Sequence, residues 1–117
     1  MDIRAQIDVF FMGRLREWTL FESIRKAICT AYPQTSLRVM KTCISFDDPK
    51  PYCYVSFPKR KSEEGLLLSI SLKERREHPR IAMITAVSKM RFTAHIPVRS
   101  DAEVDEELLA LIADSRR

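Results

Sequence analysis

Three side chains that bind anions in many proteins, Lys41, Arg91 and His95, lie in segments with the alternating pattern of β-strands. An arginine guanidinium can hold two oxygens of one carboxylate or phosphate, and a lysine adds a point charge. A histidine donates a hydrogen bond or titrates near neutral pH. Together with the adjacent hydroxyl of Thr42, they predict a small site for a phosphate or a carboxylate, provided that the strands bring them to one face.

The same charges also have a structural interpretation, because acids elsewhere in the chain can neutralise them. Candidate partners are Glu74, Glu77 and the acids of residues 101–117. A lysine on a partly covered face needs such a partner, a bound anion or water in order to stay charged. The sequence leaves both interpretations open.

Nucleic-acid binding is a second function class suggested by aromatic and basic residues. Tyr52 and Tyr54 could stack on bases, while Arg75 and Arg76 lie in the basic stretch KERREHPR. The loop at 59–64 adds further cations. No RNP-type motif accompanies them, and the acidic end of the chain would repel a phosphate backbone.

Catalysis has less support than binding. No GxSxG motif occurs, and His78 and His95 have no cysteine or serine at a spacing typical of a hydrolase. The cysteines form no CxxC pair, and the two glycines cannot make a glycine-rich phosphate loop. We therefore expect no catalytic residue, metal or cofactor. The alternative to a ligand-binding module is a protein-interaction accessory domain, and a homodimer is left open.

The composition predicts one globular domain, residues 1–117, with 45% hydrophobic residues and a net charge of +4. Its last segment is acidic and the remainder strongly basic, which permits an anionic partner. No apolar run approaches the roughly 20 residues that a membrane helix needs. Charges near the N-terminus do not fit a signal peptide, and the free-cysteine pattern fits a reducing compartment, so a cytoplasmic protein is expected.

Hydrophobic periodicity predicts helices at both ends of a run of hairpin-linked strands. The predicted elements are helices at 2–12 and 15–31, strands at 36–46, 52–57, 66–72, 81–87 and 90–98, and a last helix after Ser100. Ser100 and Glu103 have the spacing of a capping box. The charged connection at 73–80 is expected to be solvated. This order predicts a two-layer α+β domain with an antiparallel sheet of four or five strands, two N-terminal helices and one C-terminal helix.

Strand alternation divides the side chains between a face covered by helices and an open face. The face toward the helices is predicted to hold Met40, Ile44, Phe46, Cys53, Val55, Phe57, Leu66, Leu68, Ile70, Leu72, Met90, Phe92, Ala94, Ile96 and Val98. The open face is predicted to hold Lys41, Cys43, Ser45, Tyr52, Tyr54, Ser56, Leu67, Ser69, Ser71, Arg91, Thr93, His95, Pro97 and Arg99. The expected anion site therefore lies on the open face.

Four pieces of the chain, taken in order, match a family pattern. They are VMKTCISF at 39–46, the strand at 66–72 with its basic loop, RFTAH at 91–95 and SDAEVDEEL at 100–108. In this order they resemble the bacterial family known as domain of unknown function 5655, over roughly residues 7–113.

Members of that family often carry two histidines in the strand corresponding to RFTAH. Here Ala94 stands at the first histidine position and His95 matches the second. The resemblance implies that Lys41, Thr42, Arg91 and His95 are typical of the family, and it implies no activity.

Overall fold

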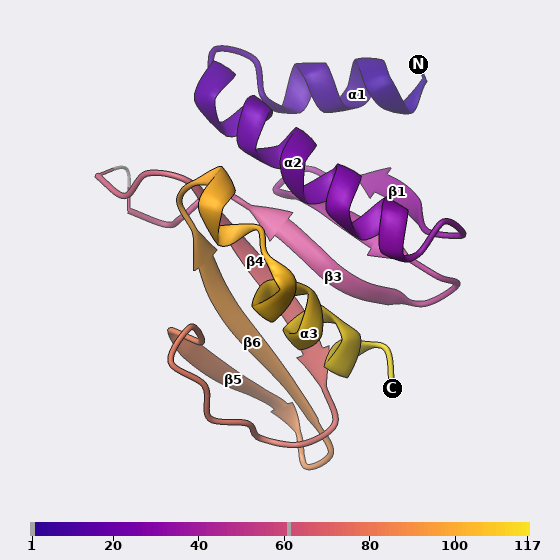
Figure 1. Cartoon of the computed structure of the whole chain (residues 1–117), viewed down its shortest axis with the longest axis vertical. Helices are drawn as coiled ribbons and strands as arrows, with labels where there is room; N and C mark the ends of the chain where they lie inside the picture. Colours follow the sequence, from indigo (N-terminus) through magenta and orange to yellow (C-terminus); the bar gives the residue numbers. More distant parts are fainter. Residues whose placement is uncertain (1, 61) are drawn as a thin grey trace.

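The computed structural model describes residues 2–60 and 62–117, so Lys61, part of the predicted loop at 59–64, lies outside the described residues. Helices before and after a run of strands confirm the α+β class (Figure 1). The elements are α1 (Ile3–Phe10), α2 (Leu15–Ala31), β1 (Ser36–Val39), β2 (Cys43–Asp47), β3 (Pro51–Ser56), β4 (Leu66–Leu72), β5 (Met83–Ser88), β6 (Arg91–Val98), the 3-10 turn η1 (Asp101–Glu103) and α3 (Glu106–Ser115).

The strands of the described chain form one antiparallel sheet in the order β1-β2-β3-β4-β6-β5. This sheet has six strands, whereas the sequence predicted four or five. The difference arises at 36–46, which was predicted as one strand and is a hairpin of β1 and β2. The predicted strand at 81–87 is confirmed as β5, which forms one edge of the sheet.

The turn between β1 and β2 is closed by a hydrogen bond from the Met40 N–H to the Cys43 carbonyl, 2.8 Å long. Val39 and Ile44 pair just before it, so the chain reverses at Lys41 and Thr42. Met40 is 41% exposed, so its predicted place among the helix-facing residues is wrong. Met90 is likewise exposed, because it lies in the turn between β5 and β6.

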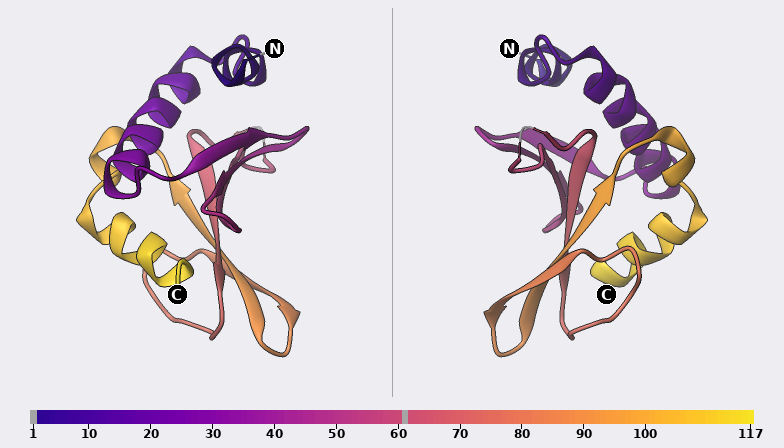
Figure 2. Two further views of the ribbon diagram at one scale, coloured as in Figure 1. Left: turned by 90° about the vertical axis from the view of Figure 1, so that its right-hand side faces the viewer. Right: turned by 90° about the vertical axis from the view of Figure 1, so that its left-hand side faces the viewer.

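Helices α2 and α3 cover one face of the strongly twisted sheet, and no helix of the described chain lies on the opposite face (Figure 2). The buried stripe of α2 is Leu20, Phe21, Ile24 and Ile28, at the spacing of three and four that predicted this helix. On the sheet, Ile44, Val55, Leu68 and Ile96 are fully buried beneath the helices. The alternation of β4 and β6 that was inferred from the sequence is thus correct over most of their length.

Phenylalanine rings gather where α1 and α2 meet the sheet. The rings of Phe10 and Phe57 stack with centroids 5.2 Å apart, and Phe11 contacts Phe21 at 5.1 Å. Phe21 in turn contacts Phe46 of β2 at 6.0 Å. We call this end of the sheet, with α1, the β1–β2 turn and Phe57, the ring end.

Helix α3 begins later than the sequence predicted. Its N-cap is Asp105, whose carboxylate accepts a hydrogen bond of 3.0 Å from the Leu108 N–H. Ser100 makes no side-chain cap, and the carboxylate of Glu103 accepts instead from the Arg99 N–H. The predicted capping box is therefore wrong, since the residues after Ser100 form the short η1 turn before the helix starts.

Candidate functional site

Lys41 and Thr42 lie in the β1–β2 turn at the ring end, and both are exposed. Arg91 begins β6 at the opposite end of the sheet, next to the β5–β6 turn. In the sheet, Cys43 aligns through β3 and β4 with Pro97 of β6. Six residues of extended strand separate Pro97 from Arg91, or about 20 Å. The structure therefore does not bring Lys41 and Arg91 together.

His95 lies midway along β6 on the open face, between two hydroxyl groups. Its Nδ1 is 2.9 Å from the Ser69 hydroxyl and its Nε2 is 3.1 Å from the Thr85 hydroxyl. Burial, with a smaller contribution from the nearby Lys59 ammonium, lowers the pKa of His95. The imidazole is thus uncharged at neutral pH and adds no positive charge to an anion site.

The Ser69–His95 contact supplies the serine partner that sequence spacing did not indicate. The geometry still differs from that of a hydrolase, because the second imidazole nitrogen meets the neutral Thr85 hydroxyl rather than a carboxylate. Ser69 is buried in the middle of β4, where its neighbours pair with β3 and β6. Strand pairing leaves no free backbone N–H groups there to stabilise an oxyanion.

The two tyrosines of β3 have different environments. Tyr54 is half-buried on the open face, opposite Ser45 and Ser69. Tyr52 is only 4% exposed, so its predicted place on the open face is wrong. A register shift where β2 meets the start of β3 interrupts the alternation, and Tyr52 packs against the Tyr32 ring.

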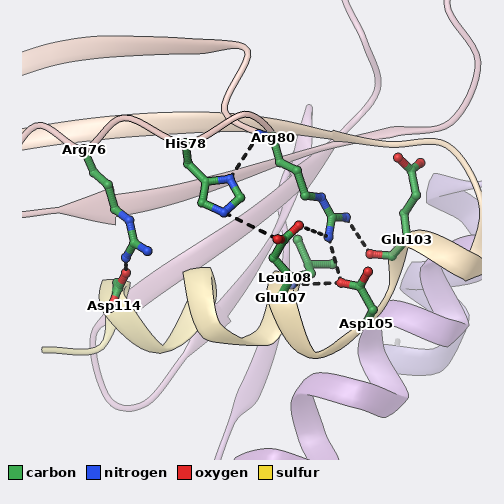
Figure 3. Close-up of polar contacts among 8 residues, drawn as sticks. All are labelled: Arg76, His78, Arg80, Glu103, Asp105, Glu107, Leu108 and Asp114. Atoms are coloured by element: carbon green, nitrogen blue, oxygen red, sulfur yellow. Dashed lines mark hydrogen bonds and ion pairs between the residues drawn. The ribbon is translucent and has the colours of Figure 1, made fainter.

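The connection at 73–80, which we call the strap, is largely exposed, as predicted, but three of its side chains also contact acids of α3 and its N-cap (Figure 3). The Arg80 guanidinium lies 2.7 Å from the Asp105 carboxylate and donates to the Glu103 carbonyl at 2.6 Å. Arg76 forms an ion pair with Asp114. Acids of the last helix therefore neutralise cations of the strap, not the three cations for which such pairing was considered.

Two strap residues, Arg75 and Arg76, were predicted as nucleic-acid contacts. They have different partners in the structure. Arg76 is held by Asp114. Arg75 is exposed, and its guanidinium lies over the Phe92 ring, 5.4 Å from the centroid. Of these two arginines, Arg75 is the one that forms no ion pair with another residue that the structure describes.

A cationic cavity of about 460 Å³ lies at the end of the sheet opposite the ring end. We call it the basic pocket, and this end of the sheet the basic end. Its lining residues are Asp48, Pro49, Lys50, Pro51, Tyr52, Tyr54, Ser71, Leu72, Lys73, Arg91, Ser115, Arg116 and Arg117. The pocket joins the β2–β3 turn, the end of β4, the start of β6 and the end of α3, all of which meet at one end of the antiparallel sheet.

Arg116 fixes the wall of the basic pocket. Its guanidinium lies over the rings of Tyr32 and Tyr52, 3.9 and 4.7 Å from their centroids, and donates to Asp48 at 2.8 Å. Burial disfavours its charged form, but the hydrogen bond to Asp48 and the neighbouring Tyr52 raise the pKa of Arg116 overall. Its second terminal nitrogen, Nη1, is buried without a hydrogen-bond partner in the described part of the chain.

Sequence reasoning identified Arg91 and Tyr54 but missed the cations that surround them. None of Lys50, Lys73, Arg116 and Arg117 was among the predicted site residues, although all four line the pocket. A signal was available, since antiparallel hairpins place the end of β4 and the start of β6 at the same end of the sheet.

A family model described as Domain of unknown function (DUF5655) matches residues 7–115. The chain belongs to the DUF5655 family. The resemblance inferred from the order of the sequence motifs is thereby confirmed. The match includes the β1–β2 turn and most of the basic pocket of this DUF5655 domain, except Arg116 and Arg117. No curated protein and no solved structure matches it.

Over residues 2–60 and 62–117, no group of three or more His, Cys, Asp or Glu side chains is placed to hold a metal ion. Cys29, Cys43 and Cys53 are free, and burial raises the pKa of each thiol. None of the helices described is long and apolar enough to cross a bilayer.

Proposed function

We propose that the chain is a small binding module whose basic pocket accepts a ligand bearing phosphate or carboxylate groups. The observation that carries this proposal is the charge of the lining. Five cations surround the pocket, and Asp48, the only acidic side chain among the described lining residues, is already paired with Arg116. The cationic residues are Lys50, Lys73, Arg91, Arg116 and Arg117. Mutual repulsion among them is relieved when an anion binds.

The exposed cations of the basic pocket are the ones that a ligand can reach. Lys50, Lys73 and Arg91 are exposed, and none of them forms an ion pair with another residue that the structure describes. Arg91 offers the planar fork that suits two oxygens of one anion, and the lysines supply point charges around it. The half-buried Tyr54 adds a ring and a hydroxyl to the same wall. This combination suits an anion attached to a planar or apolar group.

The test is a calorimetric titration with inorganic phosphate, pyrophosphate and citrate at low ionic strength. Binding of the phosphates alone identifies a phosphate ligand, and binding of citrate alone identifies a carboxylate. Replacing Arg91 and Lys73 together by glutamine is expected to weaken binding at least about tenfold, because charge-assisted hydrogen bonds are lost.

Lys89 provides a matched control for this experiment. It is exposed in the β5–β6 turn, two residues before Arg91, and does not line the pocket. Lys89→Gln should leave the affinity unchanged. Equal weakening by Lys89→Gln, or no binding of any of the three anions, would reject the pocket as an anion site.

Nucleic-acid binding remains the alternative, and the observation that supports it is that Tyr54 and Arg91 line the same pocket. Base stacking on an exposed ring and phosphate contacts to nearby cations are the usual combination for single strands. Titration with a short single-stranded oligonucleotide distinguishes the two ideas. Micromolar binding that weakens steeply with salt, and that Tyr54→Ala reduces, favours nucleic acid over a small anion.

The interaction-domain alternative draws support from β5. This edge strand pairs only with β6, and residues 81–88 carry no charge. Uncharged edge strands are templates for pairing with another strand. The homodimer would then form by β5 pairing with β5 of a second copy. Sedimentation should show a dimer that Val87→Lys converts to monomer, and a monomer at all concentrations would contradict this alternative.

The expected bacterial and cytoplasmic setting is part of the same proposal. The unpaired state of Cys29, Cys43 and Cys53 supports a reducing compartment.

A further inference from the structure

A second cavity, of about 650 Å³, lies at the ring end between α1 and the β1–β2 turn. We call it the apolar cavity. It is lined by Gln6, Val9, Phe10, Val39, Met40, Lys41, Thr42 and Phe57. Its volume lies within the range of small-molecule sites, about 300–1,000 Å³. It shares no lining residue with the basic pocket.

The wall of the apolar cavity is hydrophobic and held in place. The stacked rings of Phe10 and Phe57 both contact Phe11, which is 2% exposed in the core. Val9 and Met40 are 53% and 41% exposed beside them. Apolar side chains left open around a rigid aromatic surface gain free energy when an apolar ligand covers them. The flexible thioether of Met40 can adapt to the shape of that ligand.

One polar group and one charge stand among these apolar side chains in the β1–β2 turn. Lys41 is exposed and forms no ion pair with any other described residue, and the neighbouring Thr42 hydroxyl is exposed as well. No carboxylate lines the cavity. A ligand that fits therefore has an apolar body and carries a single negative charge, which the Lys41 ammonium can meet.

We propose that the apolar cavity binds an amphipathic monocarboxylate, such as a fatty acid, with its chain along Phe10 and Phe57 and its carboxylate at Lys41. A carboxylate fits this arrangement better than a polyphosphate does, because one lysine supplies the charge here whereas several cations line the basic pocket. The inference goes beyond the proposed function and does not depend on it, since the two cavities have separate linings.

The test compares octanoate with 1-octanol, which has the same chain length and no charge, by NMR titration of the full chain below the micelle concentration. Octanoate should shift amide signals of α1 and the β1–β2 turn and bind about tenfold more tightly than octanol, because of the charged contact to Lys41. Lys41→Gln should remove this tenfold difference and leave octanol binding unchanged. Lys26→Gln, an exposed lysine outside the cavity, should change neither affinity.

A second variant tests the apolar wall. Val9 is half-exposed on α1, so Val9→Asp should fold and should weaken both octanoate and octanol by placing a carboxylate against the chain. The proposal is overturned if octanoate and octanol bind wild type equally, if Lys41→Gln binds octanoate as wild type does, or if the shifted amides lie elsewhere. A dimer in sedimentation that Val9→Asp dissociates would also overturn it, since a second copy would then be the occupant.

Discussion

The ring end and the basic end of the sheet are held together by different forces. At the ring end, phenylalanine side chains from α1, α2 and β2 contact one another, and the cavity beside them is lined mainly by apolar side chains, with Gln6, Lys41 and Thr42 as its polar lining residues. At the basic end, the Arg116 guanidinium joins two tyrosine rings to a carboxylate, and the cavity beside it is lined by cations. One small sheet thus offers two cavities of opposite character.

This difference explains why a single anion site was the wrong geometry to expect. Lys41 and Arg91 are chemically similar, but the strand order places each at a different end of the sheet with different neighbours. What a cation binds depends on the side chains around it: several further cations around Arg91, and phenyl rings near Lys41.

The largest expected effect comes from deleting a ring at the ring end. Phe21 is fully buried and contacts both Phe11 and Phe46. Phe21→Ala should lower the free energy of unfolding by about 3–5 kcal/mol, measured by urea denaturation, because it leaves a cavity among the rings. Leu15→Ala on the same helix, where the side chain is 76% exposed, should change it by less than about 0.5 kcal/mol. Similar losses in the two variants would contradict the importance of the ring contacts.

A substitution at the basic end is expected to lower the free energy of unfolding by less than Phe21→Ala does. Arg116→Met keeps an apolar side chain but removes the hydrogen bond to Asp48 and the contacts with two tyrosine rings. We expect a loss of about 1–3 kcal/mol in the free energy of unfolding. Arg117→Met, at a side chain that is 83% exposed, should have almost no effect. If Arg116→Met cost as much as Phe21→Ala, the two ends would not differ as proposed.

Acid offers a way to remove a charge contact without deleting a side chain. The hydrogen bond from the Leu108 N–H, followed by that from Arg80, lowers the pKa of Asp105 in the folded chain. Its contribution to stability is present above the unfolded pKa of about 3.9 and is lost as the pH falls through the lower folded pKa. Asp105→Asn keeps an N-cap residue, so its free energy of unfolding should fall less than that of wild type between pH 5 and pH 2.

Arg80→Gln gives a second measurement of the same contact. The variant should show part of the reduced acid sensitivity of Asp105→Asn, because the hydrogen bond and the charge of Arg80, both of which lower this pKa, are gone. An unchanged acid dependence in both variants would show that the contact between the strap and α3 does not contribute.

The smallest effect on stability is expected for a substitution of His95, which lies midway between the two ends of the sheet. Burial and the Lys59 ammonium lower the pKa of its imidazole, so the unfolded chain takes up this proton more readily than the folded chain. The stability that depends on a neutral imidazole is present above the unfolded pKa of about 6.5 and is lost as the pH falls below it. His95→Gln, which can still bond to Ser69, should remove this part of the pH dependence in thermal melts between pH 7 and pH 5. A variant with the wild-type pH profile would place the titration elsewhere.

Much of the fold was predictable because local pattern and tertiary packing agree. The helix at 15–31 was predicted with the bounds that α2 has, and Leu66–Leu72 is β4 as predicted. The hairpin within 36–46 was not predicted. Residues 40–43 continue a pattern typical of a strand, and they contain no glycine, proline or asparagine to mark a turn. That one turn accounts for both the extra strand and the displacement of Lys41.

The candidate sites were predictable only in part, because they depend on segments far apart in the sequence. Lys41, Arg91 and Tyr54 were predicted from their side-chain chemistry. The residues that line the cavities with them come from α1, the β2–β3 turn and the end of α3. The contacts between the strap and α3 were not predicted, for a similar reason. Arg80 binds Asp105 and Glu103 across 25 and 23 residues of chain, and no local pattern reports such a contact.

The strap has a consequence for how proteases attack the chain. Trypsin cleaves after arginine only where the backbone can unfold locally, so segments held by tertiary contacts resist digestion. Arg76 and Arg80 are fastened to α3, whereas Arg75 is exposed. Concentrated salt weakens such charge contacts, so trypsin should cut after Arg76 and Arg80 faster as ionic strength rises, while the strands behind the strap stay uncut.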